Sequence, residues 1–76
     1  MTLEERIVID ESICNGKPVI RGKRITVNTI LEYLSAGESR EEILKQYPSL
    51  EAADIDACLR FASNLMNHNY IIKELA

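Results

Sequence analysis

The residues with the clearest chemical potential form a basic run between positions 17 and 24. Four of the nine Lys and Arg residues of this 76-residue chain stand there with no acid among them: Lys17, Arg21, Lys23 and Arg24. The whole chain has a net charge of −3, so the run is a local excess of positive charge on an acidic protein. A basic turn punctuated by Gly22 predicts a contact surface for a negatively charged partner, and the phosphates of DNA are the foremost candidate. Residues 17 and 21–24 are therefore the candidate residues for binding DNA or another partner.

The same cations have a structural alternative. Arg21 and Arg24 could form ion pairs with acids near the N-terminus, on the same chain or on a second copy, or the run could simply be solvated. Those acids are Glu4, Glu5, Asp10 and Glu11. The two interpretations differ in whether the folded chain itself supplies carboxylate partners to the run.

Residue types that support catalysis or metal binding are few and isolated. The single histidine, His68, has no spaced partner and is expected to be a solvated side chain near the end of the chain. Cys14 lies near Lys17, yet no His or acid is placed to complete a nucleophilic set, and Cys58 fits an apolar helix stripe. Two distant cysteines predict reduced thiols in a cytoplasmic protein. We expect no catalytic activity, no metal and no cofactor.

Short extended segments surround the basic run. The β-branched run Arg6–Asp10 predicts a strand, and turn-forming residues follow it up to position 17. A tight turn at Gly22 allows a short hairpin between segments 18–20 and 24–27, although Pro18 favours an edge position or a strand start.

Three helices are predicted after this β element. Thr26 or Asn28 caps the first, which ends before Gly37. A capping box of Ser39 with Glu42 begins the second, which must stop before Pro48. Ser49 is predicted to cap the third, which runs through about Asn67. Its apolar stripe consists of Ala52, Ile55, Cys58, Leu59, Phe61, Ala62, Leu65 and Met66.

The sequence therefore predicts a mainly α single domain with a helix-turn-helix core. Residues 1–27 form short strands and the basic turn, residues 28–67 form three helices, and residues 68–76 are a tail. The first half of the third helix carries Glu51, Asp54 and Asp56, which would repel phosphates, so we expect any DNA contact to use the 17–24 turn instead. No run of about 20 apolar residues predicts a membrane span. A chain of this size is expected to dimerise.

The segment 13–27 carries a recognisable signature. It resembles the pattern xCxGKPxIRGTRIxV of a widespread family of small bacterial proteins, catalogued only as a domain of unknown function. Segments 34–44, 47–48 and 54–55 also look like that family, and the likeness extends over about residues 6–63. Lys23 stands where the family usually has Thr, and Thr26 where Pro is common.

The resemblance implies a homeodomain-like or winged-helix-like fold with three helices and a short β element. It also implies the role of antitoxin in a type II toxin–antitoxin pair, encoded beside a PIN-like ribonuclease toxin. Antitoxins of such pairs cover the toxin with a segment that folds on binding. The segments available here are residues 1–6 and the tail, in which Tyr70, Ile71, Ile72 and Lys73 are candidates for contact with a toxin or with a second copy. The alternative for the tail is that it completes the core of its own chain. A stand-alone DNA-binding regulator and a structural or oligomerisation module are the alternative functions.

Overall fold

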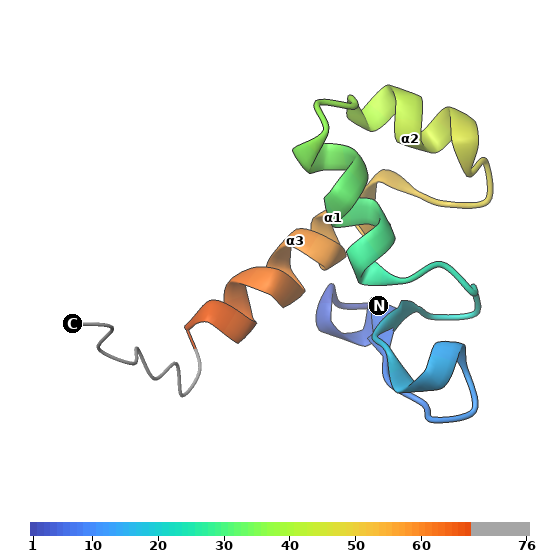
Figure 1. Ribbon diagram of the computed structural model, residues 1–76, viewed down its shortest axis with the longest axis vertical. Coiled ribbons are helices and arrows are strands. Elements are labelled where there is room, and N and C mark those ends of the chain that lie inside the picture. Colours follow the sequence, from blue (N-terminus) through green and yellow to red (C-terminus); the bar gives the residue numbers. More distant parts are fainter. Residues whose placement is uncertain (68–76) are drawn as a thin grey trace.

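The computed structural model describes residues 1–67, which form three helices and a small antiparallel sheet (Figure 1). The helices are α1 (Val27–Ser35), α2 (Arg40–Gln46) and α3 (Ala52–Met66), and the strands are β1 (Ile7–Val8) and β2 (Val19–Ile20). Two short 3-10 turns, η1 (Glu4–Arg6) and η2 (Cys14–Gly16), precede one strand each. The predicted class, mainly α with a short N-terminal β element, is confirmed. In the described part of the chain, no helix is long and apolar enough to cross a membrane.

The sheet joins segments that are distant in sequence. β1 and β2 are antiparallel, with Ile7 opposite Ile20 and Val8 opposite Val19. The strand predicted over Arg6–Asp10 is thus only two residues long. The hairpin predicted between segments 18–20 and 24–27 is reduced to one bridge, between Val19 and Thr26. It goes no further because Thr26 already caps α1, so the chain turns into a helix directly after the bridge.

The predicted caps of the first two helices are confirmed. Thr26 Oγ1 accepts a hydrogen bond of 3.1 Å from Thr29 N–H, and Ser39 Oγ accepts one of 3.1 Å from Glu42 N–H. Asn28 is not the cap of α1. The Glu42 carboxylate does not complete a capping box but lies 3.7 Å from Lys45 Nζ. Local hydrogen bonding of Thr and Ser side chains therefore sets where α1 and α2 begin.

The predicted start of the third helix is wrong. Ser49 lies in the turn before the helix, Leu50 is buried, and Glu51 is the N-cap of α3. Glu51 N–H donates to Asp54 Oδ2 at 2.8 Å, so the side chain of an aspartate in the first turn accepts a hydrogen bond from the main chain of the N-cap residue. The helix begins late because the chain first places Leu50 in the core.

The core lies where β2 and the three helices meet. Its members are Ile20, Val27, Ile30, Ile43, Leu50, Ile55 and Cys58. The predicted stripe of α3 is correct for Ile55 and Cys58 and wrong for Leu59, Leu65 and Met66, whose exposed fractions are 42%, 59% and 58%. The second half of α3 projects beyond α1 and α2 (Figure 1), so those helices leave part of its apolar side chains uncovered.

Candidate functional site

The basic run forms β2 and the turn that leads into α1. Gly22 has a φ of +76°, which L residues rarely adopt, and Lys23 N–H donates to the Ile20 carbonyl oxygen at 2.9 Å to close the turn. The side chains at positions 17, 21 and 24 are exposed, and Lys23 is half-buried. The tight turn predicted at Gly22 is thus present, and it presents the predicted cations at the surface.

The cations of the run have no carboxylate partner among residues 1–67. The ion pairs found there use Arg6, Arg40, Lys45 and Arg60 instead. The intramolecular ion pairs considered for Arg21 and Arg24 are therefore absent from the described residues.

Three of the four acids considered as their partners are engaged elsewhere. The Glu4 carboxylate lies 3.5 Å from Arg60 Nη1, and Asp10 Oδ1 accepts hydrogen bonds from Ser12. Glu5 Oε1 accepts one of 2.8 Å from Thr2 N–H, and the Thr2 hydrogen bonds lower the pKa of the Glu5 carboxyl group.

Arg21 is held by main-chain atoms rather than by acids. Its Nε donates to the Glu5 carbonyl oxygen at 2.6 Å, and its main-chain N–H donates to the Arg6 carbonyl oxygen at 2.7 Å. The Nε bond holds the guanidinium in place. No carboxylate among residues 1–67 lies within ion-pair distance of it, and its charge makes a small contribution to the lowered pKa of Glu5. Such a cation is available to an external anion at a smaller cost in side-chain entropy.

Arg6 is a structural residue that the sequence did not single out. Its Nη1 lies 2.8 Å from Glu51 Oε1 and 3.0 Å from Asp54 Oδ1. These contacts with Glu51 and then Asp54 raise the pKa of Arg6. The only signal in the sequence is that Arg6 is the single base among the first sixteen residues. Its partners lie more than forty positions away and could not be assigned from spacing.

The acids of α3 are consequently paired. Arg6 is shared between Glu51 and Asp54, and Arg40 Nη2 lies 2.6 Å from Asp56 Oδ1. Two cations therefore face three carboxylates, so one negative charge remains and the expected repulsion of phosphates is reduced but not removed. Their side chains remain poor readers of base edges.

A polar hollow of about 250 Å³ lies between the basic turn and the start of α3. It is lined by Met1, Arg6, Arg21, Lys23, Ser49, Glu51 and Asp54. Two residues of the predicted basic run thus meet the connection that precedes α3, a juxtaposition that the sequence did not indicate.

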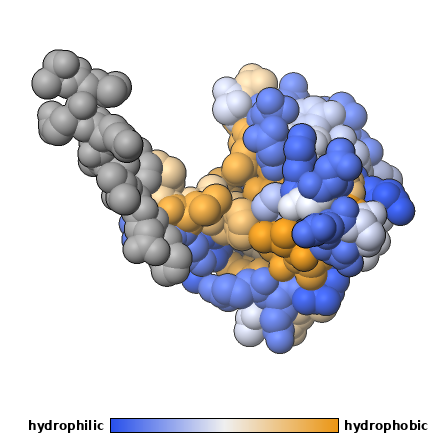
Figure 2. Space-filling model, turned by 60° about the horizontal axis from the view of Figure 1, so that its bottom comes forward, coloured by the Kyte–Doolittle hydropathy of each residue, from blue (hydrophilic) through white to orange (hydrophobic). Residues whose placement is uncertain are grey.

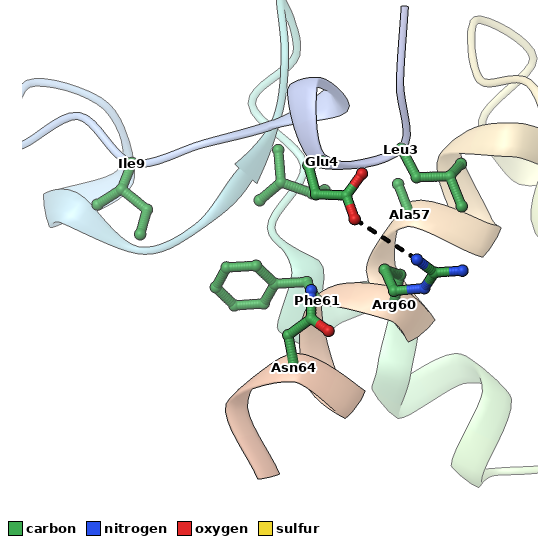
Figure 3. A pocket seen from close by; sticks show the side chains of 8 residues that line it. Leu3, Glu4, Ile9, Ala57, Arg60, Phe61 and Asn64 are labelled. Carbon is green, nitrogen blue, oxygen red and sulfur yellow. Dashed lines mark hydrogen bonds and ion pairs between the residues drawn. The ribbon is translucent and has the colours of Figure 1, made fainter. Parts of the chain in front are cut away.

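An apolar groove of about 240 Å³ lies on another part of the surface, between the N-terminal segment and the second half of α3. Figure 3 shows Phe61 and Ala57 of α3 beside Leu3 and Ile9, with the Glu4–Arg60 ion pair between the two segments. Figure 2 shows one face of the molecule on which hydrophobic side chains reach the surface among hydrophilic ones. A groove of this chemistry is typical of surfaces that contact proteins.

The remaining candidates contribute no further site. Cys58 is fully buried, and burial, with a smaller effect of the Asp54 charge, raises the pKa of its thiol to about 12. Cys14 is half-buried, with its Sγ 3.9 Å from the Arg24 carbonyl oxygen. Residues 1–6, considered as a segment for toxin contact, are tied to α3 through Glu4 and Arg6. His68 and the tail candidates Tyr70, Ile71, Ile72 and Lys73 lie outside the described residues.

Comparison with known families matches residues 7–62 to a sequence model described as "Protein of unknown function (DUF433)". The chain belongs to the DUF433 family. The matched segment begins at β1 and ends within α3, so it contains the basic turn and the starts of all three helices. The resemblance noted in the sequence is thus confirmed as far as a domain of unknown function.

Two relatives share sequence similarity with this DUF433 domain. The uncharacterized protein y4eO of Sinorhizobium fredii (strain NBRC 101917 / NGR234) is 37% identical over 51 residues, which make up 67% of this chain and 23% of that protein. The crystal structure of a DUF433 member from Anabaena variabilis ATCC 29413 is 34% identical with a TM-score of 0.76, over 82% of this chain and 61% of that one. The chain therefore spans less than two thirds of the length of either relative.

Proposed function

We propose that this protein is a non-catalytic, antitoxin-like member of a type II toxin–antitoxin pair that binds a cognate PIN-like toxin and contacts DNA through its basic turn. The observation that carries the DNA contact is the absence, within residues 1–67, of any carboxylate within ion-pair distance of Lys17, Arg21, Lys23 or Arg24. Unpaired cations gathered on one turn raise the local potential and attract the phosphates of nucleic acid.

The arrangement of the helices supports the same contact. In this proposal α2 and α3, joined by residues 47–51, form the helix-turn-helix of a homeodomain-like or winged-helix-like domain. In this proposal the turn at Gly22 acts as the wing and carries the phosphate contacts. The ion pairs of Glu51, Asp54 and Asp56 with Arg6 and Arg40 weaken the repulsion between the start of α3 and the phosphates of a duplex.

The apolar groove supports the protein contact of the proposal. Leu3, Ile7, Ile9 and Phe61 supply its apolar walls, and the same half of α3 also exposes Leu65 and Met66. A protein partner would bury this surface, and a homodimer would use it as well. The tail residues 70–73 stay candidates for the same contact with the toxin or with a second copy.

The test is co-expression of this chain with the product of the adjacent open reading frame, followed by affinity purification and gel-shift assays on the promoter DNA. We expect a stable complex with a small nuclease, neutralisation of its ribonuclease activity, and DNA binding at low salt that weakens as salt rises. Failure to bind the neighbouring protein would overturn the antitoxin assignment. Failure to bind DNA at low salt, with and without that protein, would overturn the DNA contact.

The second candidate function is a stand-alone helix-turn-helix transcriptional regulator. The unpaired basic turn favours it independently of any toxin, because phosphate attraction requires only the exposed cations. DNA binding by the isolated chain without any complex with the neighbouring protein would support this function over the antitoxin. The absence of both activities would leave a structural or oligomerisation module.

A further inference from the structure

We infer that the polar hollow between the basic turn and α3 is a binding site for one backbone phosphate of duplex DNA. The inference rests on the proposed DNA contact and names where on this domain that contact is made. The hollow measures about 250 Å³ and brings Arg21 and Lys23 of the turn opposite Ser49 and Glu51 of the connection to α3. It is therefore built from two segments that are separate in sequence.

Two cations supply the attraction. Arg21 donates through Nε to the Glu5 carbonyl oxygen, so its guanidinium is held in place while its terminal nitrogens have no carboxylate partner among residues 1–67. Lys23 is half-buried against the turn and likewise has none there. A guanidinium that is already positioned loses less conformational freedom when an anion binds.

The acids of the hollow do not cancel this attraction. Arg6 Nη1 lies 2.8 Å from Glu51 and 3.0 Å from Asp54, and Asp54 also accepts a hydrogen bond from Glu51 N–H. The lining thus contains three side-chain cations and two carboxylates, and the excess positive charge is on the side of the turn. Ser49 does not cap α3, so its hydroxyl group is available to donate to a phosphate oxygen.

The surroundings of the hollow favour a polyanion over a small free anion. Arg24 lines a second hollow together with Gly22 and Lys23, and Lys17 is exposed two residues before β2. The positive surface therefore continues past the hollow along the turn. A chain of phosphates can follow such a surface, whereas a single ion uses only one position on it.

The inference is tested by fluorescence anisotropy with a short labelled duplex over a series of salt concentrations. Lys23→Gln is expected to lower the magnitude of the log–log salt slope by about 0.9, the value for one phosphate. Its matched control is Lys45→Gln, which removes the same charge from an exposed position on α2 and is expected to leave the slope nearly unchanged.

A gain of affinity provides the opposite test. Glu51→Gln removes a carboxylate from the rim of the hollow and is expected to tighten binding about five-fold at low salt, the effect of one nearby charge at the surface. The control Glu32→Gln makes the same change in net charge on the exposed face of α1 and should change affinity by less than about two-fold. Thermal melts of each variant verify that it remains folded.

The outcomes separate the two proposals. A wild-type chain that does not bind the duplex at low salt overturns both the DNA contact and the phosphate site. If the wild-type chain binds, two equalities together overturn the phosphate site alone. These are equal salt slopes for Lys23→Gln and Lys45→Gln, and equal affinities for Glu51→Gln and Glu32→Gln. An NMR titration with inorganic phosphate gives the third arm: amide shifts at Lys23 and Ser49 without any effect of these substitutions on DNA affinity would assign the hollow to a free anion and overturn the inference.

Discussion

Nη1 of Arg6 lies 3.0 Å from Oδ1 of Asp54, whose side chain is only 8% exposed. The same nitrogen lies 2.8 Å from Glu51 Oε1, so one guanidinium joins η1 to the first turn of α3. The Arg6 carbonyl oxygen in turn accepts from Arg21 N–H at 2.7 Å. Position 6 therefore links the N-terminal segment, the basic turn and the start of α3.

The Arg6–Asp54 pair is expected to matter for stability. Arg6→Gln leaves the buried Asp54 carboxylate without a cation and should lower the free energy of unfolding by about 2–4 kcal/mol, the penalty for an unpaired buried charge. Urea denaturation followed by circular dichroism measures the loss. The double variant Arg6→Gln/Asp54→Asn should lose less than the sum of the two single variants, because the neutral amide no longer needs the cation.

Arg60→Gln is the matched control for Arg6→Gln. Arg60 lies 3.5 Å from Glu4, and the side chains of both residues are more than half exposed. An ion pair in water contributes little, so the loss should stay below about 0.5 kcal/mol. Equal losses in Arg6→Gln and Arg60→Gln would contradict the structural role assigned to the buried pair.

The sequence predicted those parts of the fold that short-range chemistry decides. Thr26 and Ser39 each bond to an N–H three positions later, so two helix starts could be located from sequence alone. The pairing of Arg6 with Asp54 spans 48 positions and has no local signal. The cap of α3 was misassigned for a related reason, because the burial of Leu50 delays the helix and only the assembled core determines that burial.

The candidate site was predictable to the same extent. The cations of the basic turn stand together in sequence, but the sequence does not show whether carboxylates of the same chain pair with them. Ser49 and Glu51 come to lie opposite Arg21 and Lys23 only through the packing of α3 against the N-terminal segment. The apolar groove has no signal in the sequence, because the stripe on α3 does not show where the other helices stop covering it.

We expect Gly22 to be required because of its backbone conformation and not because neighbouring atoms leave no room for a side chain. Its φ is +76°, and an added Cβ would meet nothing within 4 Å. Gly22→Ala should therefore lower stability by about 1–2 kcal/mol through backbone strain alone. Gly22→Asn should lose less, since asparagine tolerates the left-handed region better. Chemical denaturation of the wild type and the two variants measures the order of their stabilities. A Gly22→Ala variant that is as stable as Gly22→Asn, or more stable, would contradict the strain argument.

The projecting half of α3 is expected to contribute little to the stability of the isolated chain. Leu65→Ser should lower the free energy of unfolding by less than about 0.5 kcal/mol, because Leu65 is 59% exposed. Ile55→Ala, at a fully buried position of the same helix, should lose about 2–5 kcal/mol. Thermal melts at several protein concentrations add a second measurement. A destabilisation by Leu65→Ser that grows with concentration would indicate that a second copy covers this surface.

The Cys58 thiol is expected to make stability depend on pH in alkaline solution. Burial, with a smaller effect of the Asp54 charge, raises its pKa from 9.0 to about 12. Between these values the folded protein keeps the proton that the unfolded chain has lost. The free energy of unfolding should therefore be unaffected by this thiol below pH 9.0 and fall as pH rises above it, by up to about 1.4 kcal/mol per pH unit. Denaturation of Cys14→Ser against Cys14→Ser/Cys58→Ala over this pH range isolates the effect.

Alkylation kinetics test the same burial without denaturant. Cys58 has no exposed surface, so in the Cys14→Ser variant iodoacetamide should modify it only as fast as the domain opens. Cys14 is half-buried, and in the Cys58→Ala variant it should react directly from the folded state. The Arg6→Gln substitution should accelerate modification of Cys58 by lowering the cost of opening, while Arg60→Gln should not. Modification of Cys58 as fast as Cys14 in the wild-type background would show that α3 is not held against the core as described, and would remove the basis for placing Glu51 and Ser49 beside the basic turn.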